Sequence, residues 1–162
     1  VRVFGYGSLL NPKTLRERFE GKITADATLR GYQRTFRKEG REHLYLTLRE
    51  IEPDGNGVWG TLFDVTLPGF AKLARTEPGY DLLDVTDGLA GYPADAPQAW
   101  CFIAPPLGDE KIPPAKMRIR RSYLNRCLGG VPEPERELWL AETEIPSGVT
   151  IDEDESPVLP AR

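Results

Sequence analysis

Segments with strand composition fill the first two thirds of the sequence, and the segments with helix composition between them do not alternate with the strands one for one. Regular alternation would predict a parallel sheet, so its absence predicts an α+β domain built around a mixed or barrel-like sheet. Turn sequences such as PDGNG separate neighbouring strands, which predicts antiparallel pairing between sequence neighbours. The predicted strands cover residues 1–6, 24–37, 43–49, 58–66, 80–86 and 99–104.

Helix signals occur at several places along the chain. Asn11 can cap a helix whose first residue is Pro12, because an asparagine side chain accepts hydrogen bonds from the first helical amides and proline fits the first turn. Gly129 and Gly130 end a basic segment, as glycines commonly do after a helix. The predicted helices cover residues 12–18, 67–75, 116–128 and 134–141.

The chain has 162 residues, of which 40% are hydrophobic and 28% are charged. These proportions are typical of a soluble globular protein, and the length suffices for one core without disulfides or a structural metal. We therefore expect a single domain over residues 1–145. Residues 146–162 are expected to form an extended or flexible tail, and the acidic run 152–155 lacks the spacing of a calcium-binding loop.

The net charge of −4 argues against nucleic acid or an anionic membrane as a partner, because both attract basic proteins. No stretch approaches the ~18 uncharged apolar residues of a membrane-spanning helix. The first residues also lack the basic and apolar regions of a signal peptide. These features predict a cytoplasmic protein.

The chain contains one histidine, His43, and two cysteines, Cys101 and Cys127. This scarcity excludes most zinc sites and most catalysis by serine and histidine or by cysteine and histidine. The cysteines have no CxxC spacing, which favours two reduced thiols that pack in the core. His43 is interpreted as a strand or turn residue, because no acidic partner can be identified for it.

The stretch FGYGSLLNP (residues 4–12, the glycine loop) joins the first strand to the first helix and allows three interpretations. Gly5 and Gly7 begin a dinucleotide-binding fingerprint, but Leu10 occupies the position of its third glycine and is too large for close helix packing. Ser8 would be the nucleophile of a G-x-S-x-G elbow, but its neighbours do not match that motif. A nucleotide site and an esterase site are therefore both disfavoured.

In the third interpretation, the backbone of the glycine loop binds a small anion. Two glycines allow a sharp turn, so that the N–H groups of Gly7, Ser8, Leu9 and Leu10 converge near a helix start, where a carboxylate is favoured. The alternative is that the loop is only a tight connection between a strand and a helix.

The stretches VFGYGSLLNP, LRGYQRTF, GNGVWGTLFDVT and LARTEPGYDLLDVT follow one another over roughly the first ninety residues. In order and spacing they resemble the gamma-glutamylcyclotransferase-like family, which includes gamma-glutamylamine cyclotransferases and the more distant ChaC-type glutathione enzymes. Tyr123, in RRSYLNRCLGG, resembles a later tyrosine of that family. Residues 120–122 do not reproduce the Pro-Ser pair often found before it, which leaves the substrate subfamily open.

The resemblance implies a small mixed β-barrel with flanking helices and a cavity whose floor is the YGSL part of the glycine loop. It also implies an enzyme without a metal or an organic cofactor that acts on a small γ-glutamyl compound and releases 5-oxoproline. Carried over residue by residue, the site would consist of a catalytic Glu77 and of the substrate-binding residues Tyr6, Gly7, Ser8, Leu9, Tyr80 and Tyr123.

The implied reaction is an attack by the substrate's own α-amine on its γ-carbonyl, which needs no serine, cysteine or histidine from the protein. Glu77 can act as base and then as acid, since one carboxyl can take a proton from the amine and give one to the leaving nitrogen. Partial burial of Glu77 would raise its pKa toward neutrality. The alternative function is a non-catalytic module that binds a small molecule in the same cavity.

Basic side chains concentrate in and around the predicted helix 116–128. We interpret them as a solvated face that balances the acidic C-terminal region, and the alternative is that they attract an acidic substrate or a partner. The residues are Lys116, Arg118, Arg120, Arg121 and Arg126.

Overall fold

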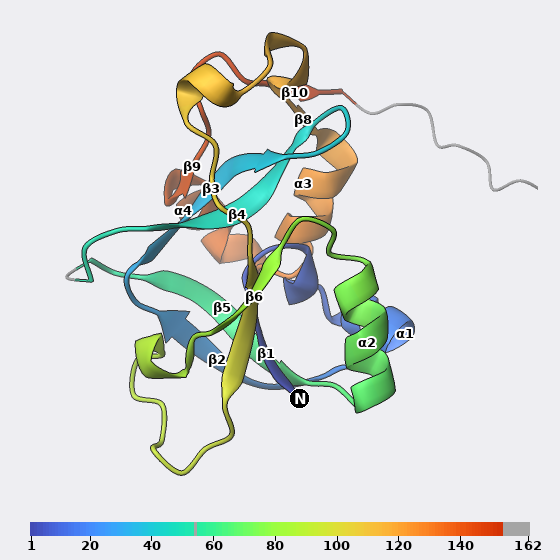
Figure 1. The fold of residues 1–162 in the computed structure, drawn as a ribbon, viewed down its shortest axis with the longest axis vertical. Helices are drawn as coiled ribbons and strands as arrows, with labels where there is room; N and C mark the ends of the chain where they lie inside the picture. The colour runs from blue at the N-terminus through green and yellow to red at the C-terminus, as the bar shows by residue number, and fades with distance from the viewer. Residues whose placement is uncertain (54, 154–162) are drawn as a thin grey trace, which may run out of the picture.

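The computed structural model describes residues 1–53 and 55–153, and its largest element is a five-stranded sheet (Figure 1). Its strands are β1 (Arg2–Gly5), β2 (Lys22–Leu29), β5 (Val58–Asp64), β6 (Asp81–Asp84) and β7 (Ala99–Ile103). They lie in the order β2-β5-β1-β7-β6, so β1 is central, antiparallel to β5 and parallel to β7. The outer pairs, β2 with β5 and β6 with β7, are antiparallel.

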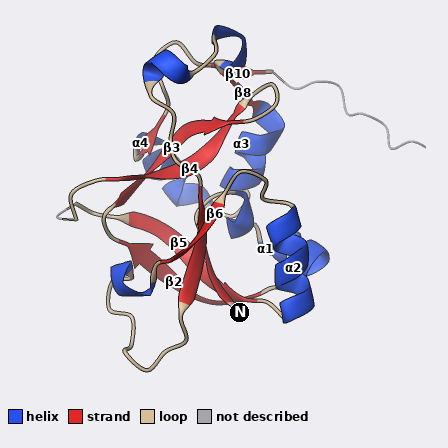
Figure 2. Cartoon of the chain, viewed as in Figure 1, coloured by secondary structure: helices blue, strands red, loops and turns tan. Residues whose placement is uncertain are grey.

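Two smaller sheets complete the β structure. β3 (Tyr32–Glu39) and β4 (Leu44–Glu50) form an antiparallel hairpin, and β9 (Thr143–Glu144) pairs with β3 in parallel. β8 (Arg118–Arg120) and β10 (Thr150–Asp152) form a parallel pair. In the view of Figure 2 the hairpin lies above the five-stranded sheet and crosses its direction.

Helices flank the sheets, and α1 and α2 lie next to each other at one side of the five-stranded sheet (Figure 2). The α-helices are α1 (Pro12–Phe19), α2 (Leu67–Arg75), α3 (Arg121–Leu128) and α4 (Arg136–Ala141). Short 3-10 helices are η1 (Ser8–Leu10), η2 (Thr86–Gly88), η3 (Asp109–Lys111), η4 (Pro114–Lys116) and η5 (Glu133–Glu135). Over the described residues, no helix has the length and apolar character that crossing a membrane requires.

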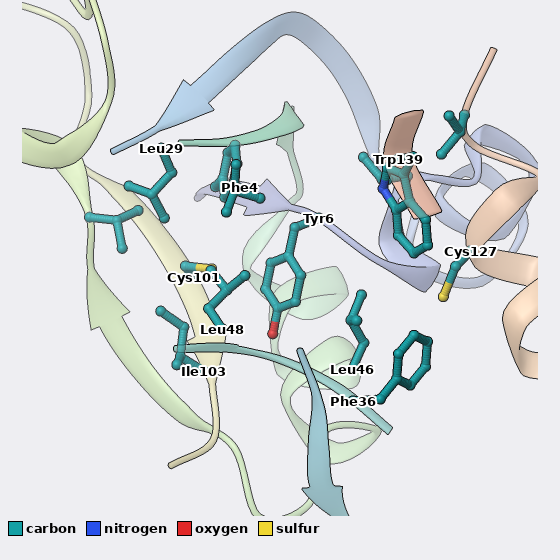
Figure 3. Packing of buried hydrophobic residues seen from close by; sticks show 14 of the residues in the cluster. Phe4, Tyr6, Leu29, Phe36, Leu46, Leu48, Cys101, Ile103, Cys127 and Trp139 are labelled. Carbon is teal, nitrogen blue, oxygen red and sulfur yellow. The ribbon is translucent and has the colours of Figure 1, made fainter. Parts of the chain in front are cut away.

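The central strand β1 contributes to buried clusters on both faces of the sheet. Val3 packs in a cluster with Leu15 of α1 and Leu73 of α2. Phe4 packs in the other cluster, which includes Leu46 of the hairpin (Figure 3). Successive side chains of a strand point to opposite faces, so two adjacent apolar residues tie the helices to one face and the hairpin to the other.

The described strands form three separate sheets and do not close into a barrel, which corrects the expected mixed β-barrel, whereas the α+β class is confirmed. The predicted strand 24–37 is interrupted at Gly31, whose φ of 79° lets the chain leave the five-stranded sheet. The two halves of that segment, β2 and β3, therefore belong to different sheets. Pairing between sequence neighbours holds for β3 with β4, but β2 pairs with β5.

Capping side chains define the starts of the first two α-helices. The Asn11 side chain accepts hydrogen bonds from the N–H groups of Lys13, at 3.1 Å, and Thr14, at 3.4 Å. The Thr66 hydroxyl accepts one from the N–H of Gly69 at 3.1 Å. Because these caps satisfy amides that have no partner within the helix, they place both helix starts where the sequence predicts them.

The predicted helix 116–128 is wrong in its first part. Arg118–Arg120 is the strand β8, in which Ile119 is buried and Arg120 is exposed, and the helix begins only at Arg121. The segment is extended because it pairs with β10, which comes from the region expected to be a tail. Within the predicted tail 146–162, residues 150–152 are thus extended and paired, and residues 154–162 lie outside the described residues.

Several basic residues of this segment pair with carboxylates, most of them near the C-terminus. This agrees with the interpretation that the basic face balances the acidic C-terminal region. The pairs are Lys116 with Glu39 at 2.6 Å, Arg118 with Asp152 at 3.6 Å and Arg121 with Glu153 at 3.6 Å.

The single histidine and both cysteines are structural residues. His43 is 3% exposed, and its Nε2 lies 2.7 Å from Oδ2 of Asp152, an acidic partner that the sequence does not reveal. Cys101 and Cys127 are buried free thiols, and burial raises the pKa of both. They remain protonated at neutral pH and serve as packing groups, as predicted.

Candidate active site

A cleft of about 680 Å³ opens between the glycine loop, α1, the β3–β4 turn, the segment after α2 and α3. A recess of about 30 Å³ adjoins it, with room for a group about the size of a water molecule. The residues that line both spaces are Ser8, Leu9, Glu77, Tyr80 and Tyr123. The recess is also lined by Tyr6 and Gly7, so the fold brings all the predicted site residues together.

The glycine loop enters this site as a strand end followed by the one-turn helix η1. The N–H of Leu10 donates to the carbonyl of Gly7 at 2.9 Å, so this amide is not available to a ligand, contrary to the expectation. The amides of Gly7, Ser8 and Leu9 precede the first bond of the turn and have no partner within it. Three amides rather than four can therefore face a ligand.

The glycine loop is closely packed, and at two positions around it, Gly7 and Gly130, a side chain would be crowded. A Cβ on Gly7 would lie 3.0 Å from Cδ2 of Leu46 in β4. A Cβ on Gly130, just after α3, would collide with the backbone of Leu10. The hairpin and the end of α3 therefore hold the loop from two sides, which fixes the position of its amides.

Tyr80 and Tyr123 both form hydrogen bonds with the main chain of Leu46 in β4. The Tyr80 hydroxyl donates to the carbonyl of Leu46 at 2.7 Å, and the N–H of Leu46 donates to the Tyr123 hydroxyl at 3.4 Å. The Tyr123 ring also meets the Tyr45 ring edge to face, with 4.9 Å between centroids. Burial raises the pKa of both site tyrosines, so they are neutral cleft walls at physiological pH.

Tyr6 contributes to the recess mainly as a packing residue. The residue is 7% exposed, and its ring lies near Leu46, Leu48 and Cys101 (Figure 3). Its hydroxyl donates to the carbonyl of Phe102 at 2.7 Å, and burial raises its pKa. The phenol is already bonded within the protein, which leaves the adjacent loop backbone as the part that can bind a ligand.

Glu77 stands in a tight turn at the end of α2. Its N–H donates to the carbonyl of Ala74, and its own carbonyl accepts from the N–H of Tyr80, both at 3.3 Å. Gly79 adopts a φ of 78° and closes this turn. A residue with a side chain would adopt this backbone conformation less easily. The turn directs Glu77 and Tyr80 to the same recess as the glycine loop.

The carboxyl of Glu77 has a raised pKa. Burial raises its pKa from the ordinary 4.5 to about 7, and the positive charges of Lys38 and Arg18 oppose that shift. No hydrogen bond or ion pair to the Glu77 side chain occurs within residues 1–53 and 55–153. A carboxyl that exchanges its proton near neutral pH suits acid and base chemistry.

Cations line the cleft, and the sequence analysis did not connect Arg18, Lys38 or Arg41 with the site. They come from α1, β3, the β3–β4 turn and α3, and no motif spans such separate elements. One of them, Lys38, lies 5.2 Å from the centroid of the Tyr80 ring. Arg126, interpreted as part of the solvated basic face, also lines the cleft. The set is Arg18, Lys38, Arg41 and Arg126.

No protein-family model and no curated protein matches the sequence, but solved structures match the fold. A structure named gamma-glutamyl cyclotransferase superposes with a TM-score of 0.60 and covers 94% of this chain and 93% of its own, at 18% identity. The chain has the gamma-glutamylcyclotransferase-like fold.

Two further solved structures match the chain over most of its length. An uncharacterized protein from Homo sapiens matches with a TM-score of 0.63 and 17% identity, over 94% of this chain and 93% of that one. YkqA from Bacillus subtilis matches with a TM-score of 0.63 and 18% identity, over 91% of this chain and 56% of YkqA. At such identities the likeness concerns the fold, and a reaction has to be argued from the site.

Proposed function

We propose that the protein is a γ-glutamylcyclotransferase that converts a γ-glutamyl amine or γ-glutamyl amino acid into 5-oxoproline and the free amine. The observation that carries the proposal is the position of Glu77, which lines the same recess as the glycine loop. Burial raises the pKa of its carboxyl to about 7. The fold, which a protein named gamma-glutamyl cyclotransferase shares, supports the same reaction.

The reaction needs only the substrate and one group that moves a proton. The α-amine nitrogen forms a bond to the γ-carbonyl carbon, and the bond from that carbon to the leaving nitrogen breaks. The α-ammonium loses a proton and the leaving nitrogen gains one, so the reaction balances without a further reactant. Glu77 in its charged form takes the proton and then returns it, and a pKa of about 7 suits both steps at neutral pH.

The glycine loop has the complementary role of holding the glutamyl end. The amides of Gly7, Ser8 and Leu9 would bind the α-carboxylate, so that the flexible chain folds back and the amine meets the γ-carbonyl. An amide that also meets the developing oxyanion would stabilise the transition state. Tyr80 and Tyr123, held by Leu46, would form rigid walls around the folded substrate.

A panel of γ-glutamyl compounds tests the proposed reaction. We expect 5-oxoproline, measured by chromatography, from at least one of glutathione, the γ-glutamyl dipeptides and ε-(γ-glutamyl)lysine. A binding module without activity would yield no product from any compound, while its ligand would raise the melting temperature of the protein. That pair of results would overturn the proposal.

Substitution of Gly7 by alanine is expected to lower kcat/KM by about 10- to 100-fold, because a displacement well under 1 Å at a positioning group is costly. The added Cβ would press on Leu46, which holds both tyrosines, and would shift the loop amides. Gly55→Ala is the control, since its Cβ would meet Ile51 at an ordinary 3.8 Å. Unchanged kinetics in a folded Gly7→Ala protein would show that the loop does not bind the substrate.

A further inference from the structure

The 680 Å³ cleft outside the recess, called the outer cleft below, is strongly positive in a protein whose net charge is −4. Its basic lining residues are Arg18 of α1, Lys38 of β3, Arg41 of the β3–β4 turn and Arg126 of α3. Lys38 is half-buried, and the three arginines are exposed at the rim. Side chains from four separate elements thus place positive charge around one opening.

These cations are not neutralised by the protein within residues 1–53 and 55–153. None of them takes part in an ion pair there, whereas the neighbouring Lys116, Arg118 and Arg121 all do. Two carboxyls also line the cleft, namely Glu39 and Glu77. Glu39 is already paired with Lys116 at 2.6 Å, so the cleft keeps an excess of positive charge.

The charge is distributed unevenly along the site. The recess beside the glycine loop is lined by apolar groups, tyrosines and loop backbone, and Glu77 is its one ionisable acid or base apart from the tyrosines. All the cations lie in the larger outer space. A substrate whose glutamyl end is bound in the cleft against the loop backbone and Glu77 would therefore extend its leaving part outward among the cations.

From this arrangement, and on the basis of the cyclotransferase activity proposed above, we infer that the outer cleft is an anion subsite that selects substrates with an acidic leaving part. A γ-glutamyl amine has no net charge, and a γ-glutamyl compound of a neutral amino acid carries one negative charge. An acidic amino acid or acidic peptide as the leaving part adds at least one more. The preferred substrate class is thus a γ-glutamyl acidic amino acid or peptide.

Two substrates of nearly equal size test the subsite. γ-Glutamyl-glutamate and γ-glutamyl-glutamine differ by one carboxylate, and we expect kcat/KM to be roughly 10-fold higher for the glutamate compound at low salt, since several weak attractions add. The preference should shrink as ionic strength rises, because exposed charges are screened. Equal values for the two compounds would overturn the subsite and leave the cyclotransferase activity standing.

Matched arginine variants locate the effect. Arg18→Gln and Arg126→Gln should each reduce the preference for the acidic compound by about 1.5- to 5-fold. Arg16→Gln is the control: Arg16 is exposed on the same helix as Arg18 but does not line the cleft, and residues two apart face different directions on a helix. A preference that is undiminished in the double variant Arg18→Gln/Arg126→Gln would contradict this assignment.

A binding measurement keeps the two proposals separate. If no compound of the γ-glutamyl panel yields 5-oxoproline, the proposed reaction fails, and titration calorimetry with γ-glutamyl-glutamate and γ-glutamyl-glutamine then decides the subsite. Tighter binding of γ-glutamyl-glutamate that is lost in Arg18→Gln/Arg126→Gln would support the subsite without catalysis. Equal affinity for both compounds, or no binding of either, would overturn it.

Discussion

Replacement of Glu77 by glutamine is expected to lower kcat for 5-oxoproline formation by about 10²- to 10⁴-fold, the usual contribution of a positioned acid and base. Glutamine has nearly the same shape and fills the same place in the recess, but it cannot accept the proton of the α-ammonium. KM should change little, because the loop amides that are proposed to hold the glutamyl end remain. The measurement is steady-state kinetics on the best compound of the γ-glutamyl panel.

Glu137→Gln is the matched control, since Glu137 is an exposed glutamate of α4 that does not line the cleft. Its kinetics should equal those of the unmodified protein. A Glu77→Gln protein that keeps more than about a tenth of the original kcat would exclude Glu77 as the main proton carrier, given the size of general acid and base effects.

The same substitution is expected to stabilise the protein above neutral pH. The Glu77 pKa is about 7 in the folded protein and near 4.5 when exposed. Between these values the folded state keeps a proton that the unfolded state has lost, so the free energy of unfolding falls as pH rises through this window. The full loss is at most about 3 kcal/mol and is complete above the folded pKa.

Glutamine does not titrate, so the Glu77→Gln protein should avoid this loss. Urea unfolding of both proteins at about pH 4, 6 and 8 measures the difference, which should grow with pH because only one protein carries the perturbed group. A difference that is the same at all three values would mean that Glu77 has an ordinary pKa. The acid needed for catalysis is thus expected to destabilise the fold at the pH where it works.

Local signals in the sequence predict α1 and α2 well. Asn11 and Thr66 bond to amides only a few residues away, so the helix starts depend on short-range interactions. Strand pairing depends on residues far apart in sequence, which is why the pairing of β2 with β5 and the strand β8 were not predicted. β8 exists because β10, about thirty residues later, pairs with it.

In the candidate site, too, the residues in recognisable local stretches were predicted, and those brought together only by the fold were not. The glycine loop and Glu77 belong to recognisable stretches, and the fold places them at one recess. The sequence analysis proposed that burial would raise the Glu77 pKa, and in the structure burial acts on this carboxyl in that direction. Arg18, Lys38 and Arg41 carry no local signal, because their common feature is a cleft that forms only when their separate elements pack together.

Main-chain groups hold much of this site in place. Tyr80 and Tyr123 bond to the peptide groups of Leu46, and Tyr6 bonds to the carbonyl of Phe102. A peptide group is the same in every residue, so the amino acids at these anchor positions can change over evolution while the bonds persist. A site held in this way depends little on which side chains Leu46 and Phe102 carry.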